Sequence, residues 1–109
     1  MTAQEVVRRL KMAGIPVAYL AFTPEEKVNP PYMIYATAGE DGISSDDEVF
    51  GEICNYRVEL YMRKKDYALE KKIKKIIGEI DSKYTSDETY ISEEKLIEKI
   101  FEFETEEEI

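Results

Sequence analysis

Histidine and tryptophan are absent from this chain of 109 residues, and cysteine occurs once, at Cys54. Without histidine, serine and cysteine nucleophiles lack their usual base, and one cysteine is too few for a zinc site. A lone cysteine also excludes an intrachain disulfide and is typical of a protein from a reducing compartment. We therefore expect a protein that is not an enzyme and that holds no cofactor.

Long apolar runs and nucleotide-binding glycine motifs are missing as well. No stretch approaches the ~20 apolar residues of a membrane span, and neither GxGxxG nor GxxxxGK[ST] occurs. Arg8, Arg9 and Lys11 lie in an amphipathic segment with no apolar run behind them, so no signal peptide is expected. The net charge of −9 argues against a general nucleic-acid binder. These features predict a soluble, cytoplasmic protein.

Two amphipathic helices are predicted. Thr2 and Glu5 form a capping box, and Gly14 is a natural terminator, which together predict a helix over 3–13. Asp66 is a candidate N-cap for the second helix. The apolar stripe of that second helix consists of Leu69, Ile73, Ile76, Ile77 and Ile80. The lysines off this stripe indicate a solvated helix face, because the chain as a whole is acidic.

Several segments have the composition of strands. Residues 17–22 and 32–38 are apolar and rich in strand formers, and the second of them is expected to be central. Residues 49–63 show the clearest alternation, with a bulge expected near Gly51. The apolar face of this strand carries Cys54, Tyr56, Val58, Leu60 and Met62. The segment 95–104 fits either a helix or a strand, and its Phe-Glu-Phe-Glu alternation favours the strand.

Strands between and after two helices, without regular alternation, predict an α+β fold. We expect a single domain over residues 1–109 with a mostly antiparallel sheet and both helices packed on one face. The glycine-punctuated acidic segment 39–48 is predicted to be a loop. Residues 85–92 contain further strand formers, and the acidic end at 105–109 is expected to fray.

The carboxylates of the acidic segment offer one possible site for chemistry. They are Glu40, Asp41, Asp46, Asp47 and Glu48. Carboxylate oxygens bind Mg²⁺ and Ca²⁺, but this spacing does not match an EF-hand loop. The favoured interpretation of this segment is a solvated or partner-facing loop. A metal-dependent enzyme that uses these carboxylates is less favoured than either a structural protein or a protein-binding adaptor.

The eight tyrosines are a large share for this length. Tyr61 lies on the polar face of the 49–63 strand with Arg57 and Arg63, and Tyr and Arg are enriched in protein interfaces. We therefore predict an interface that draws on this face and on the acidic segment. Its candidate residues are Asp41, Asp46, Asp47, Phe50, Arg57, Tyr61 and Arg63.

Four segments carry a resemblance to a known family. They are Gly14-Ile15-Pro16-Val17-Ala18-Tyr19, Pro30-Pro31-Tyr32-Met33-Ile34-Tyr35, Val58-Glu59-Leu60-Tyr61 with Lys64-Lys65-Asp66, and Ile100-Phe101-Glu102-Phe103-Glu104. In this order they resemble the small tail-completion proteins of long-tailed phages and prophages, in the tail-terminator or head-to-tail joining group. The likeness spans nearly the whole chain.

The resemblance implies a virion structural protein. Such subunits assemble as a ring, typically a hexamer, at the head-proximal end of the tail tube, where they meet the tail-tube protein and the head connector. It also implies a place in the bacterial host cytoplasm during assembly and in the virion tail afterwards. The resemblance further implies that the acidic loop becomes ordered on assembly. It implies no catalytic residue and no specific nucleic-acid or membrane partner. The alternative is a small cytoplasmic adaptor or regulator that binds one protein through its sheet face.

Overall fold

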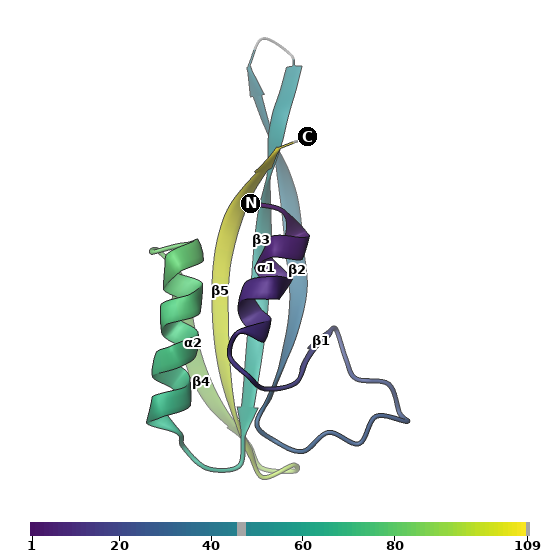
Figure 1. Ribbon diagram of the computed structural model, residues 1–109, viewed down its shortest axis with the longest axis vertical. Coiled ribbons are helices and arrows are strands. Elements are labelled where there is room, and N and C mark those ends of the chain that lie inside the picture. The colour runs from purple at the N-terminus through teal and green to yellow at the C-terminus, as the bar shows by residue number, and fades with distance from the viewer. Residues whose placement is uncertain (46–47, 109) are drawn as a thin grey trace.

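In the residues that the structure describes, two helices and one five-stranded sheet make up the fold (Figure 1). The structure, a computed structural model, describes residues 1–45 and 48–108, and the side chains of residues 1–37 and 53–107. In chain order the elements are α1 (Ala3–Lys11), β1 (Val17–Tyr19), β2 (Tyr32–Ser45), β3 (Glu48–Met62), α2 (Tyr67–Ile80), β4 (Thr85–Ile91) and β5 (Leu96–Glu108).

The sheet has the strand order β1-β2-β3-β5-β4. Only the pairing of β1 with β2 is parallel, and the other three pairings are antiparallel. The predicted α+β fold with a mostly antiparallel sheet is therefore confirmed. β2 lies between β1 and β3, as its apolar residues on both faces predicted.

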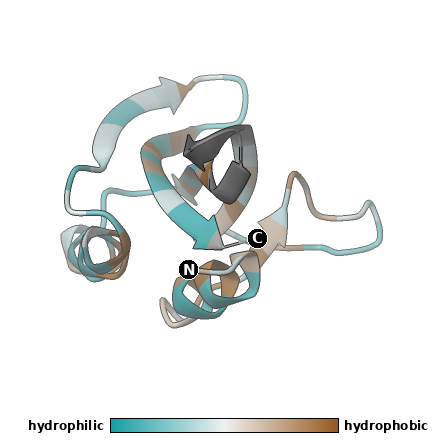
Figure 2. Cartoon of the chain, turned by 90° about the horizontal axis from the view of Figure 1, so that it is seen from above, coloured by the Kyte–Doolittle hydropathy of each residue, from teal (hydrophilic) through white to brown (hydrophobic). Residues whose placement is uncertain are grey.

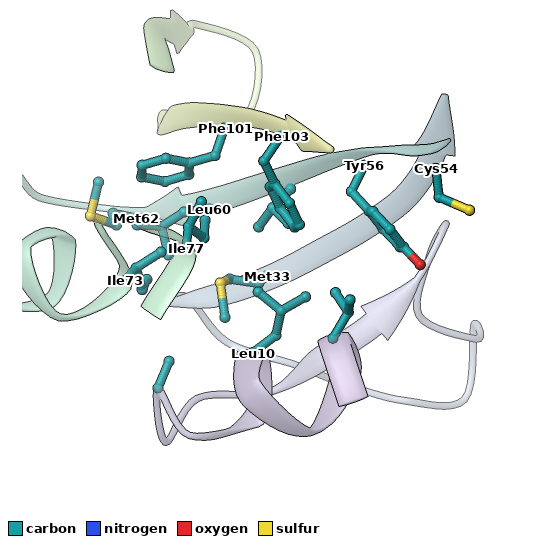
Figure 3. Close-up of a cluster of buried hydrophobic side chains, with 13 residues drawn as sticks. Leu10, Met33, Cys54, Tyr56, Leu60, Met62, Ile73, Ile77, Phe101 and Phe103 are labelled. Atoms are coloured by element: carbon teal, nitrogen blue, oxygen red, sulfur yellow. The ribbon is translucent and has the colours of Figure 1, made fainter. Parts of the chain in front are cut away.

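One face of the sheet is covered by both helices, and the core lies between the two layers (Figures 1 and 2). The alternation along β3 aims five side chains at the helices, and all five are buried, from Cys54 to Met62. Opposite them lie Leu10 of α1 and Ile77 of α2 (Figure 3), and Val6 of α1 belongs to the same buried cluster. The remaining buried apolar residues of the core are Ala13, Met33, Ile73, Phe101 and Phe103.

Local capping fixes where both helices begin. The Thr2 hydroxyl accepts a hydrogen bond from the Glu5 amide at 3.2 Å, and the Asp66 carboxylate accepts one from the Leu69 amide at 3.0 Å. Each bond satisfies an amide that the helix leaves without a partner. The first helix ends at Lys11, two residues before the predicted end, because the chain turns there toward a Gly14 with φ of +79°.

Two strands are longer than predicted, so the loop predicted at 39–48 and the frayed end predicted at 105–109 are wrong for the residues that the structure describes. Residues 39–45 and Glu48 do not form a loop but continue the β2–β3 ladder, while Asp46 and Asp47 lie outside the described residues. Likewise residues 105–108 are not frayed but pair with β3. Strand formers are few in both segments, yet pairing with β3 satisfies their backbone groups and overrides this weak local preference.

The extended strands project beyond the helices as a ribbon of β2, β3 and β5, which we call the arm (Figure 1). The register of the β2–β3 pair shifts twice, between Thr37 and Gly39 and between Ile43 and Ser44. The second shift skips Phe50 beside Gly51, which confirms the predicted bulge. Bulges of this kind bend and twist the strands in which they occur.

Two further strand predictions have mixed outcomes. The first strand ends at Tyr19 rather than Phe22, because Leu20 has a φ of +65° that turns the chain away from the sheet. The strand prediction for 95–104 is confirmed, since β5 covers these residues from Leu96 onward, and the helix alternative is wrong. The strand formers within residues 85–92 lie in β4, which ends at Ile91.

We expect Leu10→Ala to lower the free energy of unfolding by about 2–5 kcal/mol, because it empties a fully buried position between α1 and the sheet. The matched control is Met12→Ala, since Met12 is 59% exposed and should change stability by no more than ~0.5 kcal/mol. Urea denaturation followed by circular dichroism measures both. Equal losses in the two variants would contradict this account of the core.

Candidate interaction surface

The sheet face opposite the helices has no layer over it within the described chain, and we call it the open face (Figure 2). The alternation that buries Val58 and Leu60 directs Arg57, Glu59 and Tyr61 to this side. Their side chains are only partly covered; the exposed fractions are 42% for Arg57 and 24% for Glu59. Polar groups held in place on an uncovered sheet are suited to binding another protein surface.

A chain of hydrogen bonds fixes these side chains. The Arg57 guanidinium donates to Glu59 Oε1 at 2.9 Å, and the Tyr61 hydroxyl lies 2.6 Å from both Glu59 Oε2 and Glu98 Oε2. The hydroxyl carries one proton, so it donates to one carboxylate at a time. Burial, and then the two carboxylates, raise the pKa of Tyr61 well above its usual value, which keeps the phenol protonated.

Aromatic rings extend this surface toward one end of the sheet. The rings of Tyr32 and Tyr61 stack with centroids 5.1 Å apart, and Phe22 meets Tyr32 edge to face at 5.4 Å. Stacked rings lose little conformational freedom when a partner binds, which favours them as contact points. The structure thus brings Arg57 and Tyr61 together as predicted and adds Glu59, Glu98 and Tyr32.

The other predicted interface residues are placed elsewhere or lie outside the described side chains. Arg63 follows β3, is exposed, and lines a shallow hollow with Pro30 and Pro31 rather than joining the Arg57 and Tyr61 cluster. Asp46 and Asp47 lie outside the described residues. For Asp41 and Phe50 the structure describes the backbone within the arm but not the side chain.

An ionic cluster on the helix side of the sheet escaped the sequence analysis. Lys99 is 8% exposed, and its ammonium lies 3.6 Å from Glu70 and 3.9 Å from Glu88. Lys65 donates to the same two carboxylates, at 2.8 Å and 2.5 Å. The signal in the sequence was Lys99 itself, a charged residue between Ile97 and Phe101 on the apolar face of its strand. This cluster ties α2 to β4 and β5.

A second feature missed from sequence is an apolar groove of about 500 Å³ between α1 and the β1–β2 edge. Val7 lies on the helix side, while Tyr19, Tyr35 and Tyr56 line the sheet side. Tyr56 is buried, and its hydroxyl donates to Glu107 at 2.9 Å. Burial and this carboxylate raise the pKa of Tyr56 above its usual value. The groove shares no lining residue with the Arg57 and Tyr61 cluster.

Neither a metal centre nor a membrane helix is found in the part of the chain that the structure describes. No group of three or more acidic or cysteine residues there is arranged to hold a metal ion. No helix among the same residues has the length and apolar character needed to cross a bilayer. Comparison with known protein families and with curated proteins finds no match to this chain.

Replacing Tyr61 by Phe should lower the free energy of unfolding by about 1–2 kcal/mol, because a carboxylate that is partly buried loses its donor. Thermal or urea unfolding at neutral pH measures the change. Tyr90→Phe is the control, since Tyr90 is 60% exposed and should change stability by no more than ~0.5 kcal/mol. Equal stability of the two variants would show that the hydrogen bond from the Tyr61 hydroxyl to a carboxylate does not stabilise the fold.

Lys65→Gln removes the ion pairs of Lys65 with Glu70 and Glu88 and should lower the free energy of unfolding at neutral pH. We expect a loss of only about 1 kcal/mol, because the Lys65 side chain is 30% exposed and solvent weakens these ion pairs. Hydrogen bonding to Lys65 lowers the pKa of Glu88 below 4.5. This stabilisation is therefore present above pH 4.5 and is lost as the pH falls through the lowered pKa of Glu88.

The stability difference between the wild type and Lys65→Gln should accordingly shrink in acid. Hydrogen bonding to Glu70 and Glu88 raises the pKa of Lys65, so its own contribution is lost only as the pH rises above 10.5. Urea titrations across the acid range measure the difference, with Lys64→Gln, an exposed neighbour, as control. A difference that stays constant below pH 4 would contradict the role given to Glu88.

Proposed function

We propose that this chain is a structural subunit of a phage or prophage tail, acting as a tail terminator or head-to-tail joining protein. In this proposal copies form a hexameric ring at the head-proximal end of the tail tube. The ring contacts the tail-tube protein on one side and the head connector on the other. The chain carries no catalytic role, is made in the bacterial cytoplasm, and ends in the virion tail.

The arm is the observation that carries this proposal. It runs past both helices, so its strands have no helix layer to pack on (Figure 1). Ribbons of two or three strands need a packed apolar face for stability. In the proposed ring a neighbouring subunit or the tube supplies that face. A subunit that acted alone would gain nothing from strands extended in this way.

Two other features support assembly with copies or partners. The α+β architecture that the resemblance implies is the one observed, with seven elements in the order given above. The open face also leaves Arg57, Tyr61 and Tyr32 accessible, and Arg and Tyr side chains contribute strongly to protein interfaces. An arm and an open sheet face give one subunit two separate surfaces for contacts.

We expect the purified chain to form a closed ring of about six subunits, alone or when mixed with a candidate tail-tube protein. Light scattering across a concentration series measures the mass, and negative-stain electron microscopy shows whether the ring closes. A lysozyme-sized acidic protein without affinity for the tube serves as the mixing control. A chain that remains monomeric and does not bind the tube would favour the adaptor that binds through its sheet face.

A further inference from the structure

Positive charge is concentrated in the helix layer. Helices α1 and α2 carry seven of the chain's 15 Lys and Arg residues but only three of its 24 Asp and Glu residues. The seven are Arg8, Arg9, Lys11, Lys71, Lys72, Lys74 and Lys75. The rest of the chain therefore carries more negative charge than the net value of −9.

The carboxylates of this layer are largely occupied already. Glu70 is buried and pairs with Lys65 and Lys99. Glu5 binds Arg8 and Arg9 at 2.6 Å and 3.2 Å, and these hydrogen bonds hold the pKa of Glu5 at about 2. The four lysines of α2 are exposed, and none forms a salt bridge with a described carboxylate. The outer surface of the helices is consequently basic.

The open face has the opposite sign. The residues of β3, β4 and β5 that point to it include one guanidinium, that of Arg57, and six carboxylates. The six are Glu59, Asp87, Glu98, Glu102, Glu104 and Glu106. Two partly covered isoleucines, Ile34 and Ile100, lie beside Glu59 in the same row across the sheet. The face is thus acidic around an apolar centre.

A complementary hollow lies on the helix side. Arg8 and Arg9 of α1 and Ile76 and Glu79 of α2 line a space of about 240 Å³ between the helices, together with Met12, which is 59% exposed. Two guanidiniums and one carboxylate surround an apolar floor there, and the excess positive charge of the layer comes from the exposed lysines of α2. An acidic surface with apolar side chains at its centre matches this hollow in hydrophobicity and the lysines of α2 in charge.

We propose that copies of this chain associate head to tail, with the open face of one copy seated on the helix layer of the next. This inference rests on the proposed ring and names the two surfaces that build it. Both complementary surfaces belong to the same chain, which makes a second copy the partner. They lie on opposite sides of the sheet (Figure 2), so each copy can bind two neighbours at once. Such a contact repeats, and it closes into a ring if the rotation between copies closes.

Two charge-reversal variants test the pairing of these surfaces. The helix variant carries Lys72→Glu and Lys75→Glu, and the sheet variant carries Glu102→Lys and Glu104→Lys. All four residues are exposed, and none of their side chains belongs to the ionic cluster or the Tyr61 hydrogen bonds. Sedimentation velocity at low ionic strength measures the self-association of each variant, alone and in an equimolar mixture.

Each variant alone should lose at least ~100-fold in self-association, because like charges then meet at the interface. The mixture should recover assembly, since each reversed surface then meets its complement on the other variant. Raising the salt to about 0.5 M should weaken wild-type assembly, because it screens these charges. Recovery in the mixture is the result that a merely destabilised subunit would not give.

Matched controls reverse the same number of charges in loops, with Lys27→Glu and Lys95→Glu for one variant and Glu25→Lys and Glu93→Lys for the other. All four positions are exposed, and these variants should assemble like the wild type. If the helix and sheet variants form rings as readily as the wild type, the pairing of these two surfaces is wrong, although the proposed ring is not. A wild type that stays monomeric both alone and with the tube protein would remove the ring and the inference together.

Discussion

The rest of the fold depends on β3, because this strand pairs along both edges and its alternation assigns each side chain to the core or to the open face. A slip of one residue would turn Arg57 and Glu59 under the helices and expose Val58 and Leu60. Charges buried without partners cost several kcal/mol, so one register is strongly preferred. The register of β3 therefore determines both the core and the interaction surface, so a shift that alters one face also alters the other.

Lys99 interrupts the corresponding alternation of β5 with a charge, and the fold compensates for it locally. The residue lies on the core face of β5, where an unpaired ammonium would be costly. Glu70 from α2 and Glu88 from β4 supply negative charge, and Lys65 completes the cluster. A buried ion pair adds little net stability over apolar packing, but losing one partner is strongly unfavourable. The cluster thus disfavours any packing of α2 that would separate Glu70 from Lys99.

Local signals predicted most of the fold, and long-range pairing explains the misses. The caps at Thr2 and Asp66 and the alternation along residues 54–62 are readable from neighbours in sequence. The extension of β2 through an acidic, glycine-containing segment cannot be predicted from neighbouring residues, because it depends on hydrogen bonds to a partner strand. For the candidate surface, Arg57 and Tyr61 share a strand and were predicted together. Glu98 lies 37 residues from Tyr61, so only the folded sheet brings it there.

The segregation of charge also bears on which symmetry the proposed assembly adopts. A two-fold dimer places the same surface on both partners. Open face on open face would bring the Glu98 and Glu102 carboxylates of two copies together, and helix layer on helix layer would oppose their lysines. Like charges in contact cost several kcal/mol, so both two-fold arrangements are disfavoured. Head-to-tail contact alone pairs opposite charges, and repulsion against the symmetric alternatives makes the heterologous arrangement specific as well as attractive.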